Sequence, residues 1–109
     1  MADERKLDVS DAQLNIVCEL LHRHVPQYEV WAFGSRVRGS ARRFSDLDLV
    51  VLAECPLPLD TSAALKEAFS ESDLPWTVDV VDWASTSPAF RDVIRGKKII
   101  VQRASGSPT

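Results

Sequence analysis

The chain has 109 residues, which is enough for one domain of ordinary size and too few for two. Hydrophobic residues make up 45% and charged residues 27%, so disordered, collagen-like and coiled-coil chains are disfavoured. The formal net charge of -3 argues against general electrostatic binding to nucleic acid or anionic lipid, and no apolar run approaches the roughly 20 residues of a membrane span. We therefore expect a cytoplasmic protein with no membrane contact and no direct nucleic-acid binding.

The first half of the chain predicts one helix and two strands. Residues 1–8 are polar and are expected to fray. Ser10 is typical of a helix N-cap, and apolar residues then recur at helical spacing until Pro26 ends the helix. The aromatic and β-branched stretch 28–33 predicts a strand. The run 46–52, in which two aspartates alternate with leucine before three apolar residues, is too short and too continuous for a surface helix and predicts a second strand that is covered on both faces. Both strands are expected to lie centrally in a sheet.

The second half predicts two more helices and two more strands. A helix is expected over Thr61–Phe69 with Thr61 as its cap, followed by a strand over 76–83. Ser87 before a proline is typical of a helix start and predicts a helix over 88–95, which leads to a last strand over 98–102. The order of elements is therefore α β β α β α β.

Strands interleaved with helices predict an α/β (α+β) domain in which helices cover a sheet. We expect one domain over residues 1–109, and residues 104–109 have the composition of a flexible tail.

Three acidic residues lie where the predicted strands meet turns. Asp46 and Asp48 are two positions apart, so their side chains share one face of a strand, with backbones roughly 7 Å apart. That spacing suits one or two hard divalent cations, and carboxylate oxygens favour Mg²⁺ or Mn²⁺ over Zn²⁺. On the third predicted strand Asp79 and Asp82 point to opposite faces. Asp79 lies deeper in that strand and is predicted to join the pair, whereas Asp82 is expected to be a structural or surface acid.

The turn after the first predicted strand supplies the opposite kind of chemistry. Gly34 lets backbone amides approach a phosphate closely, and Ser35 adds a hydroxyl donor. Four arginines follow within eight positions: Arg36, Arg38, Arg42 and Arg43. Because Arg36 is next to Ser35, we predict that it contacts phosphate, and the roles of the other three stay open. Arginines and amides facing metal-binding carboxylates suit a nucleoside triphosphate.

Gly34 and Ser35, ten intervening residues and then Asp46, Leu47 and Asp48 resemble the signature of the polymerase β-like nucleotidyltransferase superfamily. The stretches 30–45 and 74–83 are similar to the minimal nucleotidyltransferase (MNT) family, the small subunits of bacterial two-component pairs whose partner is a helical HEPN protein. The resemblance covers about residues 10–103.

The resemblance implies a truncated polymerase β-like palm with a mixed sheet flanked by helices. It also implies binding of a nucleoside triphosphate, with ATP expected, and of two Mg²⁺ ions, for which Mn²⁺ could substitute. Carried over by position, Gly34 and Ser35 hold the β and γ phosphates, while Asp46, Asp48 and Asp79 ligate the metals. In the family, the acid that Asp79 matches also helps to activate the acceptor hydroxyl.

Family members paired with a HEPN toxin act as antitoxins and adenylylate a tyrosine of the partner. The resemblance thus implies that this chain transfers AMP to a HEPN-type protein. The family's separate substrate-binding domain has no counterpart here, so we expect the acceptor site to come from elsewhere. Assembly into a homo- or hetero-oligomer stays open.

One alternative of a different class remains. The chain could be a non-catalytic nucleotide-binding subunit that neutralises or scaffolds a partner by contact and keeps its acids as a nucleotide sensor. The three carboxylates favour catalysis, and the missing acceptor domain favours dependence on a partner. A phosphate-binding P-loop is excluded, because Ser40 and Ala41 stand where lysine and then serine or threonine are required.

Three tryptophans lie in apolar predicted strands: Trp31, Trp76 and Trp83. We expect them to anchor the core or a partner interface rather than to stack on bases. Phe90 is a further candidate for a partner surface.

Overall fold

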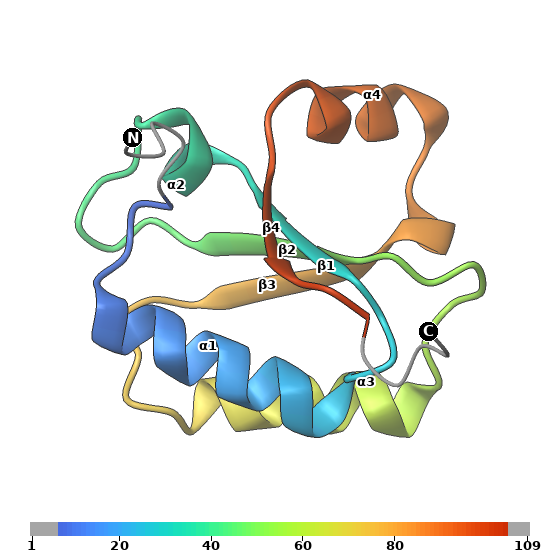
Figure 1. Cartoon of the computed structure of the whole chain (residues 1–109), viewed down its shortest axis with the longest axis horizontal. Helices are drawn as coiled ribbons and strands as arrows, with labels where there is room; N and C mark the ends of the chain where they lie inside the picture. The colour runs from blue at the N-terminus through green and yellow to red at the C-terminus, as the bar shows by residue number, and fades with distance from the viewer. Residues whose placement is uncertain (1–6, 105–109) are drawn as a thin grey trace.

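The computed structural model describes residues 7–104, which form a four-stranded sheet with helices on both faces (Figure 1). Along the chain the elements are α1 (Asp11–His24), β1 (Val30–Phe33), α2 (Ser35–Arg38), β2 (Leu47–Val51), α3 (Leu59–Ser70), β3 (Val78–Asp82), the 3₁₀ turn η1 (Trp83–Ser85), α4 (Pro88–Gly96) and β4 (Ile99–Gln102). No helix in this described part is long and apolar enough to cross a membrane.

The sheet is mixed and has the strand order β3-β2-β1-β4. β1 pairs antiparallel with both β2 and β4, whereas β2 and β3 run parallel. The two strands predicted to be central, β1 and β2, do occupy the middle of the sheet. The register sets Asp48 opposite Phe33 of β1 on one side and opposite Asp79 of β3 on the other.

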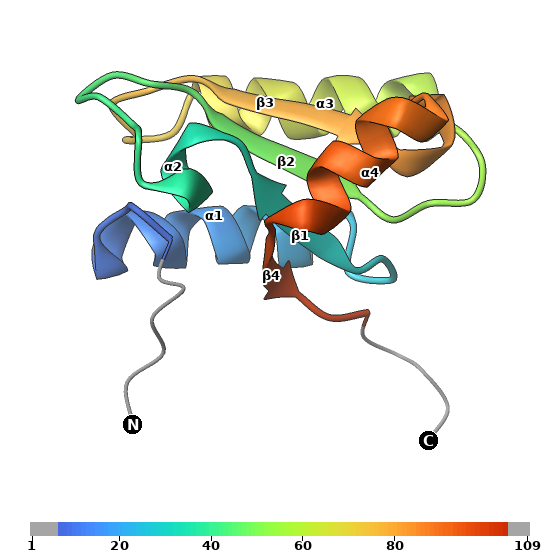
Figure 2. The ribbon, with the colours of Figure 1, turned by 90° about the horizontal axis from the view of Figure 1, so that it is seen from above.

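The two faces of the sheet are covered differently, as Figures 1 and 2 show. On one face α1 and α3 lie side by side and enclose the main core, whose side chains include Val17, Leu21, Leu49 and Leu65. On the other face Ile94 of α4 packs against Phe33 and Val50, forming a smaller cluster. Successive side chains of a strand alternate between faces. Along β2 and β3, the residues that alternate with the main-core residues therefore point to the face covered by α4.

The helix starts follow from local hydrogen bonds. The Ser10 hydroxyl accepts from the Gln13 N–H at 3.1 Å, and the Ser10 N–H donates to the Gln13 side chain at 2.8 Å, forming a capping box. Ser87 caps α4 by accepting from the Phe90 N–H at 3.1 Å. These two predicted helix starts are confirmed.

The predicted start of α3 is wrong. The helix begins at Leu59, with Pro58 in the N-cap position, and Thr61 lies inside the first turn. The Asp60 carboxylate accepts from the Thr61 N–H at 2.9 Å. An acid in the first turn thus satisfies the donor that a capping side chain would have taken.

The segment before α1 is held by the domain where the structure describes it. Leu7 packs into the main core, and the Asp8 N–H donates to the Arg36 carbonyl at 2.9 Å. We predicted that residues 1–8 fray. This prediction is wrong for Leu7 and Asp8, because Leu7 is buried in the core and Asp8 is held by a backbone hydrogen bond. Residues 1–6 and 105–109, which include most of the predicted tail, lie outside the described residues.

Candidate functional site

A pocket of about 610 Å³ opens on the α4 side of the sheet, where β1 runs into α2. Its walls come from the end of β1, the first turn of α2, the loop before β2, the strands β2 and β3, and α4. The lining residues are Phe33, Gly34, Ser35, Arg38, Phe44, Ser45, Asp46, Asp48, Asp79, Val81, Phe90 and Val93. Every residue predicted for the site is among them except Arg36.

Gly34 brings the backbone of the turn directly against a carboxylate. Its φ is +87°, in the region that favours glycine, and a Cβ atom at this position would overlap Asp48 Oδ2 and lie 3.1 Å from Asp48 Cγ. The Gly34 carbonyl accepts from the N–H groups of Val37 and Arg38, each at 3.0 Å, and so closes the short helix α2 onto the turn. The first turn of a helix leaves N–H groups without acceptors inside the helix, and Ser35, the first residue of α2, lines the pocket.

The three carboxylates gather around the same pocket. Asp48 and Asp79 are register partners on neighbouring parallel strands, and Asp46 precedes β2. The pKa of Asp48 is raised to about 6, first by burial and then by the negative charges of Asp79 and Asp46, while Arg38 opposes the shift. Asp48 is half-buried and the other two acids are exposed. The pocket therefore concentrates negative charge around its innermost carboxylate.

Arg36 does not take the predicted position. Its side chain is 5% exposed and donates to four backbone carbonyls: Asp8 at 2.8 Å, Ser45 at 3.0 Å, Arg43 at 3.1 Å and Arg42 at 3.3 Å. The guanidinium carbon also lies 4.6 Å from the ring centroid of Trp76. Arg36 therefore holds the loop that leads to Asp46, and its hydrogen bonds tie this loop to the start of the domain.

Arg38 is the arginine that lines the pocket. Because successive residues of a helix turn by about 100°, residues two apart lie on nearly opposite sides, whereas residues three apart share a face. Ser35 and Arg38 are three apart on α2 and face the pocket together, and Arg36 is turned to the interior. The helical spacing was the signal in the sequence that could have distinguished the two arginines, but α2 itself was not predicted.

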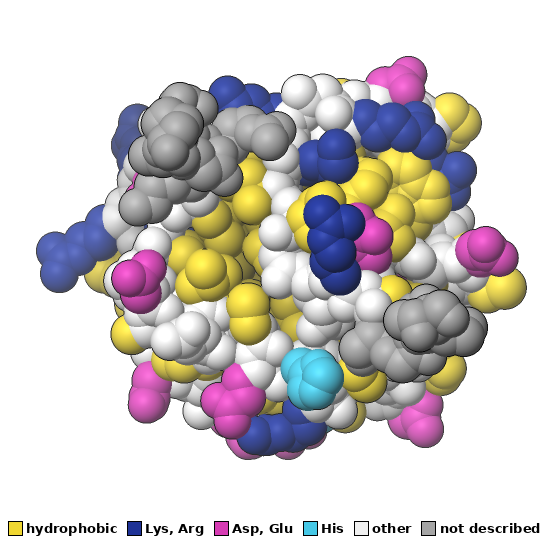
Figure 3. Space-filling view, in the orientation of Figure 1, with side chains coloured by type: hydrophobic (Ala, Val, Ile, Leu, Met, Phe, Trp, Pro, Cys, Tyr) yellow, Lys and Arg dark blue, Asp and Glu magenta, His cyan; other side chains and the backbone are white. Residues whose placement is uncertain are grey.

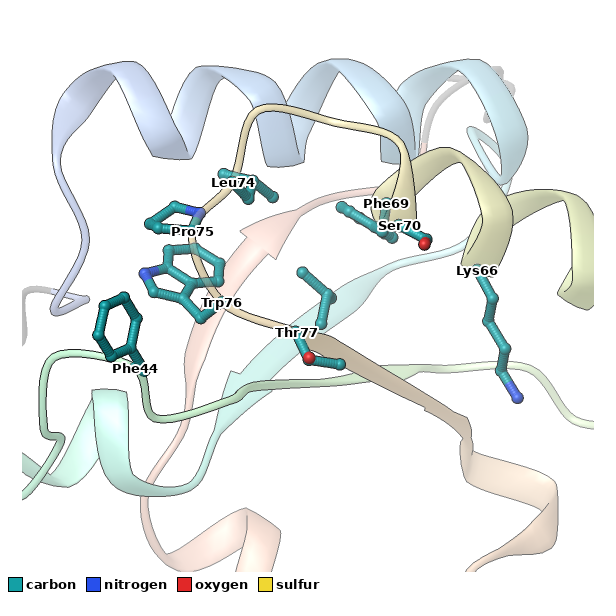
Figure 4. Close-up of a pocket in the computed structure, with 9 residues that line it drawn as sticks. Phe44, Lys66, Phe69, Ser70, Leu74, Pro75, Trp76 and Thr77 are labelled. Carbon is teal, nitrogen blue, oxygen red and sulfur yellow. The ribbon is translucent and has the colours of Figure 1, made fainter.

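A second pocket, of about 410 Å³, lies beside the first and shares Phe44 with it. Figure 4 shows Phe44 next to Trp76 and Pro75, with Lys66 at the far side. Its lining contains no carboxylate: Phe44, Lys66, Phe69, Ser70, Leu74, Pro75, Trp76, Thr77 and Val78. Trp76 is 7% exposed and acts as a core anchor, as predicted. The acidic chemistry therefore belongs to the first pocket.

The donors available for a cation in the first pocket are all carboxylate oxygens, with the Ser35 and Ser45 hydroxyls nearby. Across residues 7–104, no three His, Cys, Asp or Glu side chains come close enough together to hold a metal ion by themselves. Mg²⁺ is commonly bound by one or two carboxylates together with substrate phosphates, so such a site is completed by the substrate. Asp82 lies on the opposite face of β3 and has a structural role: its carboxylate accepts from the Ser85 N–H at 2.8 Å and from the Leu57 N–H at 3.4 Å.

The sequence model of the family described as "Nucleotidyltransferase domain" matches residues 11–103. The chain belongs to this nucleotidyltransferase family. One relative, "Probable protein adenylyltransferase MntA" of Haemophilus influenzae, is 51% identical over 102 residues, which span 94% of this chain and 90% of the relative. The family predicted from the sequence motif is thus confirmed.

Solved structures of nucleotidyltransferases share this fold. A crystal structure of a toxin–antitoxin with AMP-PNP matches with a TM-score of 0.70 and 27% identity, covering 84% of this chain and 74% of that chain. The complex of a tri-AMPylated HEPN toxin with an MNT antitoxin from Shewanella oneidensis matches with a TM-score of 0.63 and 23% identity, over 85% and 71% of the two chains. The predicted polymerase β-like palm, a mixed sheet flanked by helices, is confirmed by these matches and by the strand pairing.

Proposed function

We propose that this nucleotidyltransferase transfers AMP from ATP to a hydroxyl group of a HEPN-type protein and thereby acts as the antitoxin of a toxin–antitoxin pair. The observation that carries the proposal is the convergence of three carboxylates with the turn at Gly34 and Ser35 around one pocket. The 51% identity to a protein named as a protein adenylyltransferase supports AMP as the transferred group. The related toxin–antitoxin structure with AMP-PNP supports ATP as the donor.

We place the triphosphate at the N-terminal end of α2. Gly34 and Ser35 line the pocket, and because Gly34 has no side chain, backbone amides of the turn can approach phosphate oxygens while Ser35 adds its hydroxyl. Arg38 takes the role that the sequence suggested for Arg36, because it alone of these two lines the pocket. A guanidinium beside an amide-lined turn forms charge-assisted hydrogen bonds to the β and γ phosphates.

Asp46, Asp48 and Asp79 would hold Mg²⁺, with Mn²⁺ as a substitute. The fit rests on the all-oxygen donor set, which Mg²⁺ prefers, and on the raised pKa of Asp48, which burial causes first and the charges of Asp79 and Asp46 increase. A bound cation would compensate this unfavourable negative charge. When bound, two such ions stabilise the attacking and leaving oxygens of an in-line displacement at the α-phosphorus.

The position of Asp79 suits it to the acceptor. β3 is an edge strand and Asp79 is exposed, whereas Asp48 lies half-buried on the neighbouring inner strand. An incoming hydroxyl therefore meets Asp79 first, and this carboxylate takes its proton as the oxygen bonds to the α-phosphorus. The bond from that phosphorus to pyrophosphate breaks, and Arg38 and the turn amides hold the negative charge of the leaving group.

The test uses the whole chain with Mg²⁺, a lysate of the native host and ATP labelled at the α-phosphate. We expect one labelled protein band with the native chain and with Asp73→Asn, an exposed loop acid outside the pocket. The band should be absent with Asp46→Asn/Asp48→Asn and with ATP labelled at the γ-phosphate, because AMP transfer keeps only the α-phosphorus. No band from the native chain, despite measured binding of MgATP, would favour the non-catalytic nucleotide-binding subunit instead.

A further inference from the structure

A second group of cations, besides the arginines between residues 36 and 43, lies near the end of this acidic chain. Residues 88–104, which contain α4 and β4, carry five lysine or arginine side chains and one aspartate, although the whole chain has a net charge of -3. The site pocket uses none of these cations. The phosphate chemistry assigned above therefore does not explain them.

Three of the cations lie over a pair of tryptophans. Arg91 and Arg95 each place the guanidinium carbon 5.0 Å from the ring centroid of Trp83, and Lys98 places Nζ 4.7 Å from that of Trp31. The two rings meet edge to face with centroids 5.6 Å apart. We call these five residues the tryptophan patch. Figure 3 shows a hydrophobic area beside α4 and β4 that Lys and Arg side chains border.

The tryptophan patch has the composition of a protein interface. Both tryptophans are partly exposed, and Ile100, which pairs with Trp31 across the sheet, is 38% exposed. Tryptophan and arginine are the residues most enriched at binding hot spots. The contacts with the rings, together with the bonds from Arg91 to Thr86 and to the Trp83 carbonyl, order these long side chains before any partner arrives. Binding then costs less side-chain entropy.

The tryptophan patch lies on the same helix as one wall of the site. Phe90 and Val93 line the pocket, whereas Arg91 and Arg95, four residues apart, face Trp83. The two surfaces are therefore separated by no more than the width of one helix, about 10 Å. A protein bound on the tryptophan patch can extend a segment over α4 into the pocket.

We propose that the tryptophan patch docks an acidic surface of the protein that accepts the nucleotide, and so brings the acceptor hydroxyl to the pocket across α4. That the docked protein is the nucleotide acceptor rests on the proposed function. That its docking surface is acidic rests on charge complementarity with the tryptophan patch. Because Arg91, Arg95 and Lys98 lie over the tryptophan rings, less ring surface is left for nucleic-acid bases to stack on. The Trp31 indole N–H donates to the Glu29 carboxylate at 2.7 Å, which further fixes the orientation of this ring.

The docking test uses defined probes on the full chain. A fluorescent decapeptide of alternating glutamate and tyrosine is titrated in parallel with its glutamine counterpart and with a ten-nucleotide single-stranded DNA. Fluorescence anisotropy is recorded at low and at moderate salt. We expect the acidic peptide to bind most tightly, and its affinity to fall at moderate salt.

Two variants of equal charge locate the binding. Arg95→Glu/Lys98→Glu reverses the tryptophan patch, and Arg23→Glu/Lys66→Glu makes the same change in charge on α1 and α3, beneath the other face of the sheet. We expect the first variant to weaken peptide binding at least tenfold and the second to change it less than twofold. Equal losses in both variants, or tighter binding of the DNA than of the peptide, would overturn the proposal.

The transfer assay separates this proposal from the proposed function. Reversal of the tryptophan patch should raise the KM for the labelled partner and leave kcat and MgATP affinity unchanged, because it touches no pocket residue. If the native chain labels no protein but the peptide results hold, the proposed transfer fails and the docking surface stands. If the reversed variant labels its partner with an unchanged KM, docking at the tryptophan patch fails and the transfer stands.

Discussion

The two faces of the sheet divide stability from chemistry. On the face covered by α1 and α3, β2 contributes Leu47, Leu49 and Val51, which are fully buried. On the face that α4 covers, the alternate position between the first two of these is Asp48, a half-buried carboxylate in an open pocket. Because strand side chains alternate, a single strand serves both purposes with adjacent residues. Neighbouring substitutions should therefore have opposite kinds of effect.

The largest expected effect on stability lies on the closed face. Leu49→Ala removes a side chain that is 0% exposed and leaves a cavity, so we expect the free energy of unfolding to fall by about 2–5 kcal/mol. Val81→Ala, whose side chain lines the open pocket, should cost about 1 kcal/mol. Urea denaturation measures both values. Equal losses would mean that the two faces contribute to stability alike.

Arg36 and Arg38 of α2 show the same division between stability and chemistry. Arg36→Met removes the donors that hold the loop carbonyls, and we expect a loss of about 3 kcal/mol in stability with faster hydrogen exchange over residues 42–46. Arg38→Met should change stability by less than about 0.5 kcal/mol and weaken ATP binding by about tenfold. Denaturation and equilibrium dialysis give the two readouts. A selective loss of ATP affinity in the Arg36 variant alone would contradict the assignment.

Two glycines have positive φ, but only Gly34 also lies against another side chain, so alanine substitutions at the two positions distinguish backbone strain from steric overlap. Gly34→Ala combines a φ of +87° with an overlap against the Asp48 carboxylate, so we expect a loss of about 2 kcal/mol. Gly39→Ala has a similar φ of +83° and nothing within 4 Å of the added Cβ, so its loss should be about 1 kcal/mol. In an Asp48→Ala background, Gly34→Ala should cost no more than the Gly39 change. Persistence of the full loss there would show that the carboxylate is not the obstacle.

The smallest expected effect is the pH dependence of Asp48. Its pKa is about 6 in the folded chain and 3.8 in the reference state, so the folded state binds the proton more tightly. The stability that this group contributes is full below about pH 4 and is lost as the pH rises through about 6. In metal-free buffer, Asp48→Asn should therefore be more stable than the native chain by about 1 kcal/mol at pH 7.5, after allowance for solvent screening, with no such gain at pH 4.

The measurement for this last prediction is the melting temperature with and without a chelator. Added Mg²⁺ and ATP should stabilise the native chain and not Asp48→Asn, since ligands that bind only the folded state raise its stability. A native chain that is the more stable of the two at pH 7.5 without metal would show that burial and the neighbouring carboxylates do not disfavour the charged form of Asp48.

Much of the fold followed from local patterns. Ser10 and Ser87 predicted their helices because capping is a contact within one turn. The apolar residues of β2 predicted a strand covered on both faces because they follow one another without the alternation of a half-exposed strand, apart from Asp48. The start of α3 was missed because a first-turn acid replaced the expected cap. The helix α2 was missed because four residues, closed onto Gly34, carry no apolar periodicity.

The amino-acid sequence by itself determined the family, the order of the main elements and the spacing that relates Gly34 and Ser35 to Asp46 and Asp48, because each of these rests on residue types at short separations. Tertiary structure decided which arginine reaches the pocket, since burial beneath the loop before β2 consumed the donors of Arg36. It also decided that Asp79 stands beside Asp48, through the parallel register of β2 and β3. The tryptophan patch likewise depends on the tertiary structure, because Trp31 of β1 is far along the chain from Trp83, which it contacts, and from Lys98.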